Sequence, residues 1–212
     1  MPYPIAGYDY TWWRGDELPA LPALAGFKVE PTLDRQLLAD LHHLNIQTIA
    51  ARIRAGSQPY VAFLHETPVA YGWSATKTAG IEEVGLEWPL SPADRNLWDF
   101  VTLEAWRGRG IYPQLLQAIL RLEVNEAQRF WIGHRADNNA SKRGILKAGF
   151  QLSALVVIAA NGQPKAVARG NRTRSFASPF GKYLGFIDVS DEELTVFDFD
   201  TIDGRSTGPA SR

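Results

Sequence analysis

A turn with two glycines and two arginines separates a strand-like segment from a helix-like one; it contains Arg107, Gly108, Arg109 and Gly110. Glycines at a helix start leave backbone N–H groups open to a ligand, at the positive end of the helix dipole and with no Cβ in the way. The arginines add positive charge, which favours a phosphate or pyrophosphate over a carboxylate. Glycines also precede helices for purely steric reasons, so an anion site is one of two alternatives for this turn.

The turn does not match the two common nucleotide-binding motifs. The dinucleotide fingerprint needs a third glycine three positions after the second, where this chain has Pro113. A Walker loop needs Gly-Lys followed by Ser or Thr, but the pair Gly181-Lys182 is followed by Tyr183. Neither nucleotide motif is therefore predicted.

A second segment, Asn138 to Phe150, completes a two-part pattern with this turn. Arg107 to Tyr112 resembles the acetyl-CoA loop of the GNAT superfamily of N-acetyltransferases (Arg or Gln, x, x, Gly, x, then Gly or Ala) in all but the last position. The segment NNASKRGILKAGF resembles the family's Asn-x-x-Ala/Ser motif with a Lys-x-Gly-Phe ending, and it follows after one helix and one strand, as in the family. Two linked motifs in the right order are more specific than either alone. The resemblance covers about residues 27 to 160.

The resemblance implies direct transfer of an acetyl group from acetyl-CoA, the co-substrate, to a primary amine in a ternary complex, without a metal. The pantetheine arm would pair with the strand before the turn, and Asn138 would fix a pantetheine amide, although this asparagine also suits a helix cap. A backbone N–H of that strand, often beside a bulge, would stabilise the oxyanion. The implied CoA-binding residues are Val101, Thr102, Leu103, Arg107, Gly108, Arg109, Gly110, Ile111, Tyr112, Asn138 and Ser141.

Two positions depart from the family pattern. Tyr112 replaces a small residue at the helix start, so its ring must point away if the backbone is to donate to the pyrophosphate. Ile145 stands where many members carry the tyrosine that protonates the CoA thiolate. Ser141 is the replacement candidate, and its alternative reading is a helix-start serine that bonds to backbone.

A carboxylate facing the acyl group is the natural proton acceptor for an amine that arrives as ammonium. Asp99 stands just before the strand segment expected to carry the thioester, and it is the first candidate. Glu83 and Glu87 lie four residues apart on the expected strand 81–88, and so on one face of it. Each of the three also reads as a solvated strand carboxylate.

Composition narrows the classes of function. The 212 residues are 45% hydrophobic, enough for one packed domain with an appendage. The net charge of -1 gives no reason to expect nucleic acid or a membrane as partner. The chain has no cysteine, which excludes disulfides, thiolate metal sites and cysteine nucleophiles, and its four histidines are not spaced as metal ligands. Because no leader is recognisable, the expected location is the cytoplasm. The expected partner is a small-molecule or peptide amine, and a homodimer is compatible with this interpretation.

Strand and helix patterns alternate along the chain and predict an α/β (α+β) fold. The resemblance makes it GNAT-like: a mixed, mostly antiparallel central sheet flanked by helices. One helix is expected over residues 32–54 and another from Tyr112. The expected organisation is an N-terminal arm at 1–26 packed on the main domain, the acetyltransferase domain at 27–160, a C-terminal extension at 161–203 and a disordered tail at 204–212. A CoA-binding module without transferase activity is the alternative function, motivated by Ile145 and Tyr112.

Overall fold

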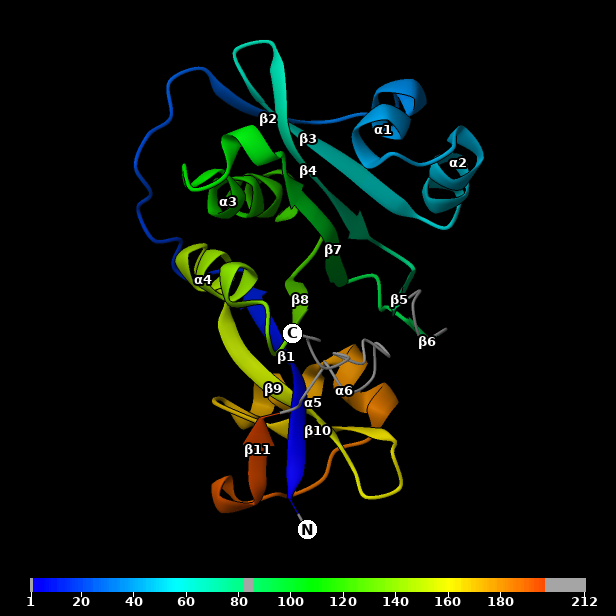
Figure 1. Ribbon diagram of the computed structural model, residues 1–212, viewed down its shortest axis with the longest axis vertical. Helices are drawn as coiled ribbons and strands as arrows, with labels where there is room; N and C mark the ends of the chain where they lie inside the picture. Colours follow the sequence, from blue (N-terminus) through cyan, green and yellow to red (C-terminus); the bar gives the residue numbers. More distant parts are fainter. Residues whose placement is uncertain (1, 82–85, 197–212) are drawn as a thin grey trace, which may run out of the picture.

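The computed structural model describes residues 2–81 and 86–196 (Figure 1). The strands are β1 (Tyr3–Trp13), β2 (Phe27–Pro31), β3 (Ser57–Leu64), β4 (Thr67–Ala75), β5 (Thr78–Ile81), β6 (Leu86–Pro89), β7 (Asp94–Thr102), β8 (Arg129–Arg135), β9 (Gln151–Ile158), β10 (Pro164–Ala168) and β11 (Leu194–Val196). The helices are α1 (Arg35–His42), α2 (Ile46–Arg54), α3 (Ile111–Glu123), α4 (Asn139–Lys147), α5 (Arg172–Ala177) and α6 (Pro179–Leu184), with 3₁₀ turns at Glu104–Trp106 and Asp191–Glu193.

The main sheet has the strand order β10-β9-β1-β8-β7-β4-β3-β2, with β11 beside β1. The pairs β7 with β8 and β1 with β11 are parallel, and the other pairs of this sheet are antiparallel. Strands β5 and β6 form a separate antiparallel hairpin. The predicted fold class, a mixed and mostly antiparallel sheet flanked by helices, is confirmed.

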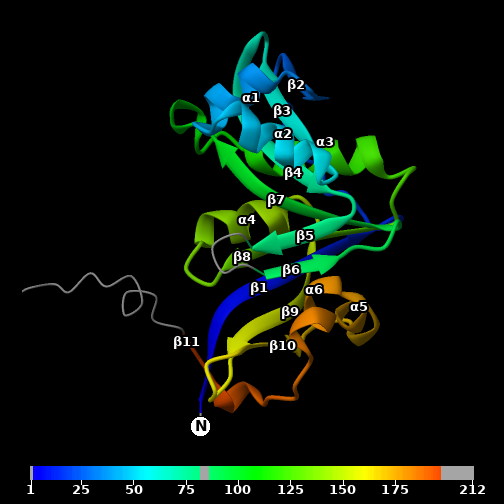
Figure 2. The same cartoon turned by 90° about the vertical axis from the view of Figure 1, so that its right-hand side faces the viewer.

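Helices cover both faces of this sheet (Figures 1 and 2). Helices α3 and α4 pack on one face through a core that includes Leu116, Ile119 and Phe130. Helices α1 and α2 pack on the other face, over β3, β4 and β7, through Leu38 and Ile49 among others. The apolar stripes of α3 and of the paired short helices therefore fix which side of β7 each helix occupies.

The N-terminal segment is part of the sheet. The sequence predicted an arm packed on the main domain, but β1 pairs with β8 on one side and with β9 on the other. Strand β10 of the C-terminal segment extends the same sheet beside β9. The boundaries at residues 26 and 160 stay predictions, but the sheet crosses both. The tail at 204–212 lies outside the described residues.

Two local predictions are wrong. The single helix expected over 32–54 is broken in two, because His43 adopts a left-handed conformation (φ 54°) and Asn45 caps α2 by accepting a hydrogen bond from Thr48 N. The single strand expected over 81–88 is replaced by β5 and β6, which run antiparallel with Ile81 beside Leu86. Within the described residues, no helix is long and apolar enough to cross a membrane.

Candidate active site

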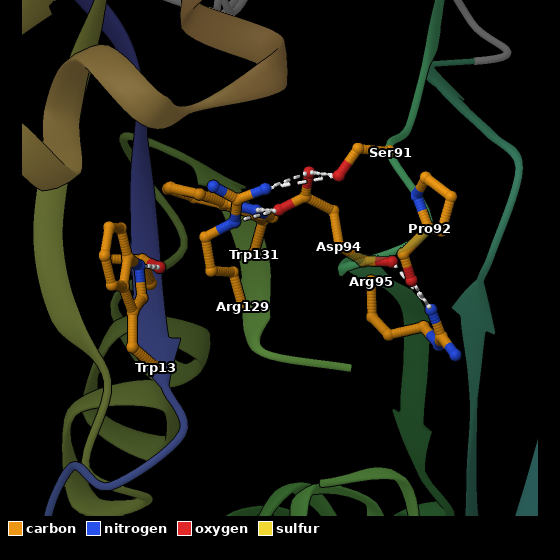
Figure 3. Close-up of polar contacts among 8 residues, drawn as sticks. Trp13, Ser91, Pro92, Asp94, Arg95, Arg129 and Trp131 are labelled. Carbon is orange, nitrogen blue, oxygen red and sulfur yellow. Dashed lines mark hydrogen bonds and ion pairs between the residues drawn. The ribbon is translucent and has the colours of Figure 1, made fainter. Parts of the chain in front are cut away.

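The parallel strands β7 and β8 are pinned together at one end by a buried carboxylate (Figure 3). Asp94 Oδ1 accepts hydrogen bonds from Arg129 Nε at 2.7 Å and from the Trp131 indole at 2.9 Å, while Oδ2 accepts one from Ser91 Oγ at 2.6 Å. Next to it, Arg95 Nε donates to Glu123 Oε2 at 2.6 Å and so ties β7 to the end of α3. These contacts hold the two strands in register where they meet.

Beyond this junction the two strands separate. Their register pairs run from Asp94 opposite Arg129 to Leu97 opposite Ile132, and no further pair follows among the described residues. The gap opens into a cavity of about 690 Å³. Its lining includes strand residues 97–102 and 132–134, the turn before α3, and the first turns of α3 and α4. The backbone edge of β7 therefore faces a cleft at the place where the sequence predicted a pantetheine arm.

Strand β7 carries a β-bulge where the cleft begins. The register between β4 and β7 shifts between Tyr71 and Trp73, so two residues of β7, Asp99 and Phe100, stand opposite Gly72. Asp99 has a φ of 51°, in the left-handed region. A Cβ on Gly72 would lie 2.1 Å from the Phe100 ring, so this glycine makes room for the ring. The bulge turns consecutive side chains of β7 away from simple alternation.

The glycine turn stands open at the mouth of the cleft. Gly108 and Gly110 both have positive φ (77° and 74°), and a Cβ built on either would meet no atom within 4 Å. Conformation, and not local crowding, thus requires glycine here. The arginine side chains contact neighbouring protein groups: Arg107 Nε donates to the Thr102 carbonyl at 3.2 Å, and Arg109 stacks 4.8 Å from the Trp106 ring.

Most of the predicted CoA-binding residues surround this cavity. Two do not line it: Leu103, which packs toward α1 and α2, and Arg109. The residues that do are Val101, Thr102, Arg107, Gly108, Gly110, Ile111, Tyr112, Asn138 and Ser141. Asn138 acts as the N-cap of α4, since its Oδ1 accepts a hydrogen bond from Ser141 N at 2.9 Å.

Two hydroxyl groups meet between α3 and α4. Tyr112 Oη lies 3.3 Å from Ser141 Oγ. The Tyr112 ring lies against Gly144, where a Cβ would come within 2.2 Å of it, so the ring points away from the glycine turn, as the sequence required. Burial raises the pKa of Tyr112 well above its usual value, against a smaller opposite effect of the bond to Ser141. Both groups line the cavity in protonated form.

Asp99 also lines the cavity, but its carboxylate is engaged from the α1 and α2 side. Arg52 Nη1 donates to Asp99 Oδ2 at 2.5 Å, and His42 Nδ1 lies 3.4 Å from the same oxygen. Burial raises the pKa of Asp99, but the hydrogen bonds from His42 and Arg52 outweigh it, so the pKa lies below the usual value. An anion held in this way is a weak proton acceptor.

Of the two glutamate candidates, only Glu87 is described, and it does not join this group. Glu87 is exposed on β6 and does not line the cavity, and Glu83 lies outside the described residues. Their expected common face depended on one strand over 81–88, which the β5–β6 hairpin replaces.

The sequence missed three residues at this site. His42 and Arg52 come from helices far from the two motifs, and no spacing rule connects them with Asp99. His134 lines the cavity from β8, where its ring stacks on Tyr10 at 5.4 Å, and burial lowers its pKa. In the described part of the chain, no three acidic or histidine side chains come together in a way that would hold a metal ion.

Comparison with solved structures identifies the fold. A GNAT-family acetyltransferase from Colwellia psychrerythraea aligns with 74% of this chain and 56% of its own, with a TM-score of 0.53 and 14% identity. A GCN5-related N-acetyltransferase from Sphaerobacter thermophilus aligns with 74% and 51%, with a TM-score of 0.54 and 13% identity. This chain has the GNAT fold. No family model and no curated protein matches its sequence.

A third GNAT-fold structure is similar to this chain over nearly its whole own length. It is the aminoglycoside acetyltransferase AAC(6')-Ib, solved with coenzyme A, and it aligns with 66% of this chain and 91% of its own, with a TM-score of 0.50 and 19% identity. This chain spans little more than half the length of the first two structures. Likeness at these identities establishes the fold, and the activity is argued from the site.

Proposed function

We propose that this protein is an acetyl-CoA-dependent N-acetyltransferase that acetylates a primary amine by direct transfer in a ternary complex. The observation that carries the proposal is the cleft between β7 and β8, which opens beside the bulge and ends at the left-handed glycines before α3. Its cavity of about 690 Å³ fits an extended arm, and its mouth presents a helix N-terminus to a diphosphate.

The chain's own groups would bind and orient the co-substrate. When bound, acetyl-CoA supplies an acetyl thioester, whose C–S bond breaks as the amine nitrogen bonds to the carbonyl carbon. The backbone at Gly108 and Gly110 would donate to the pyrophosphate, and the free edge of β7 would pair with the pantetheine amides. Holding both reactants in one cleft makes the attack effectively unimolecular, which suits a chain without a cysteine nucleophile.

The leaving thiolate needs a proton or a hydrogen bond. Ser141 is the donor that the sequence suggested, and the Tyr112 hydroxyl lies beside it at 3.3 Å, with a pKa that burial raises further above its usual value. We infer that the two hydroxyls act together toward the thiolate. A base must accept the proton of the amine, and its identity stays a prediction. The carboxylates to test are Asp99, Glu87 and Glu83, all of them suggested by the sequence.

A CoA-binding module without transferase activity is the second candidate. Ile145 is fully buried in the core and supplies no hydroxyl donor at that position of α4. The Tyr112–Ser141 pair offers such a donor from α3 and the start of α4, which favours the enzyme.

One experiment separates the two functions. Acetyl-CoA affinity is measured by calorimetry, and CoA release is then followed with a thiol reagent over a panel of polyamines, aminoglycosides, amino acids and peptide N-termini. We expect binding and turnover with at least one amine class. Binding without turnover on any amine would favour the module, and no binding would refute both functions.

A further inference from the structure

The conformation of Asp99 is unusual for its position in the sheet. With a φ of 51° it occupies the bulge position at which glycine is the usual residue, because a side chain there is crowded by the backbone. It lies two residues after Leu97, the last residue of β7 that pairs with β8, so the bulge stands where the cleft begins. A non-glycine residue keeps this conformation only when contacts of its side chain or backbone stabilise it.

The Asp99 side chain is held from the face opposite α3 and α4. Simple alternation would point Asp99 to the same face as Leu97, which belongs to the core under α3. Instead its carboxylate lies 2.5 Å from Arg52 of α2 and 3.4 Å from His42 of α1. Phe100, the other bulge residue, packs into the core under α3. The bulge thus places two successive side chains, Trp98 and Asp99, on the α1–α2 side and returns Phe100 to the α3 side.

Both partners of Asp99 are themselves fixed. The Arg52 guanidinium stacks 4.6 Å from the Trp98 ring and 5.6 Å from the Trp73 ring. The His42 side chain is 2% exposed, and its Nε2 accepts a hydrogen bond at 3.1 Å from the Trp73 indole, which can only donate. His42 Nδ1 therefore carries the proton and faces Asp99. Three titratable or charged groups face the Asp99 carboxylate: His42 on α1, Arg52 on α2 and Tyr71 on β4.

We propose that Asp99 is a positioning residue: through Arg52 and His42 its carboxylate locks the left-handed bulge of β7 and so sets the backbone edge that faces the thioester. This inference rests on the proposed function for its catalytic consequence and replaces the reading of Asp99 as proton acceptor. Its oxygen is already committed to a guanidinium on the α2 side, while the bulge backbone is what the cleft presents to a ligand.

Three substitutions at Asp99 separate positioning from proton transfer. Glycine adopts the left-handed conformation without a side chain, and asparagine adopts it and still accepts from Arg52, whereas alanine does neither. We expect kcat to fall about a hundredfold in Asp99→Ala and to stay within about tenfold of wild type in Asp99→Gly and Asp99→Asn. The acidic limb of the pH–rate profile should be unchanged in all three. Equal losses of about a hundredfold or more with a flattened acidic limb would instead identify a base and overturn the proposal.

The contact of Asp99 with Arg52 and His42, called the anchor below, is also tested by changing Arg52 to glutamine. Arg54→Gln, on the exposed face of α2, serves as the matched control. Positioning predicts a lower kcat for Arg52→Gln with the acidic limb at its wild-type pH, and no change for Arg54→Gln. A shift of the acidic limb to higher pH in Arg52→Gln would mean that Asp99 titrates in the reaction, because loss of the guanidinium raises its pKa.

A measurement without turnover distinguishes failure of the anchor from failure of the proposed function. Backbone amide hydrogen exchange of residues 98–101 should be faster in Asp99→Ala and Arg52→Gln than in wild type, and unchanged in Arg54→Gln. Exchange at wild-type rates in both of the first two variants refutes the anchor even if the protein is an acetyltransferase. Faster exchange in a protein that acetylates no amine keeps the anchor and refutes the proposed function.

Discussion

Replacing Gly110 by valine tests the proposed cofactor seat most directly. The residue has a φ of 74°, and a Cβ there would meet no protein atom within 4 Å. The cost to the folded chain therefore comes from the backbone alone, about 1–2 kcal/mol for a side chain in the left-handed region. For a chain of this size that lowers Tm by roughly 2–8 °C. The branched side chain also blocks the approach of a diphosphate to the N–H groups before α3.

The loss of affinity should be larger than the loss of stability. Two hydrogen bonds to a charged group, at about 1.5 kcal/mol or more each, correspond to roughly a hundredfold rise in the Kd for acetyl-CoA. Gly162→Val is the matched control, because Gly162 also has a positive φ of 78° and open space around its Cβ, but lies in the turn between β9 and β10. Calorimetry and thermal melts of both variants give the answer. Equal acetyl-CoA affinity in the two folded variants would place the cofactor elsewhere.

Other substitutions test single contacts. Arg109→Ala should weaken acetyl-CoA binding less than Gly110→Val, by calorimetry, because the main-chain donors remain. Ser141→Ala should lower kcat and leave the acidic limb of the pH–rate profile in place, and an unchanged kcat would remove this hydroxyl from the chemistry. Asp94→Ala removes the carboxylate that pins β7 to β8 and should cost about 3 kcal/mol in denaturant unfolding, since it leaves buried donors unpaired; a loss below about 1 kcal/mol would refute this. Burial raises the pKa of Asp9 to about 7, so the folded state binds its proton more tightly than the unfolded chain and stability falls from about pH 4 to 7. Asp9→Asn should therefore raise Tm at pH 8 more than at pH 5, and an equal effect at both would contradict the buried acid.

The sequence predicted the elements whose signals are local. Asn138 caps α4, as its residue type suggested, and α3 starts directly after the two glycines. A cap and a left-handed glycine act within a few residues, so their effect is readable without the rest of the chain. The linked motifs then pointed to the fold that the structure shows. The break between α1 and α2 was also local, but the Asn45 cap inside an apolar periodic stretch was not recognised.

Contacts between distant segments were decided by the tertiary structure alone. The N-terminal strand lies between β8 and β9. The sequence did not predict this position, because strand pairing across more than a hundred residues leaves no periodic pattern in either strand. The Tyr112 hydroxyl meets Ser141 only because α3 and α4 pack side by side against the same face of the sheet. Alternation along β7 would have turned Asp99 toward α3, and a one-residue bulge opposite Gly72 turned it toward Arg52 instead. The sequence by itself predicted most of the loop and helix-start residues that line the cleft, whereas the direction in which each polar side chain points was determined by register and packing.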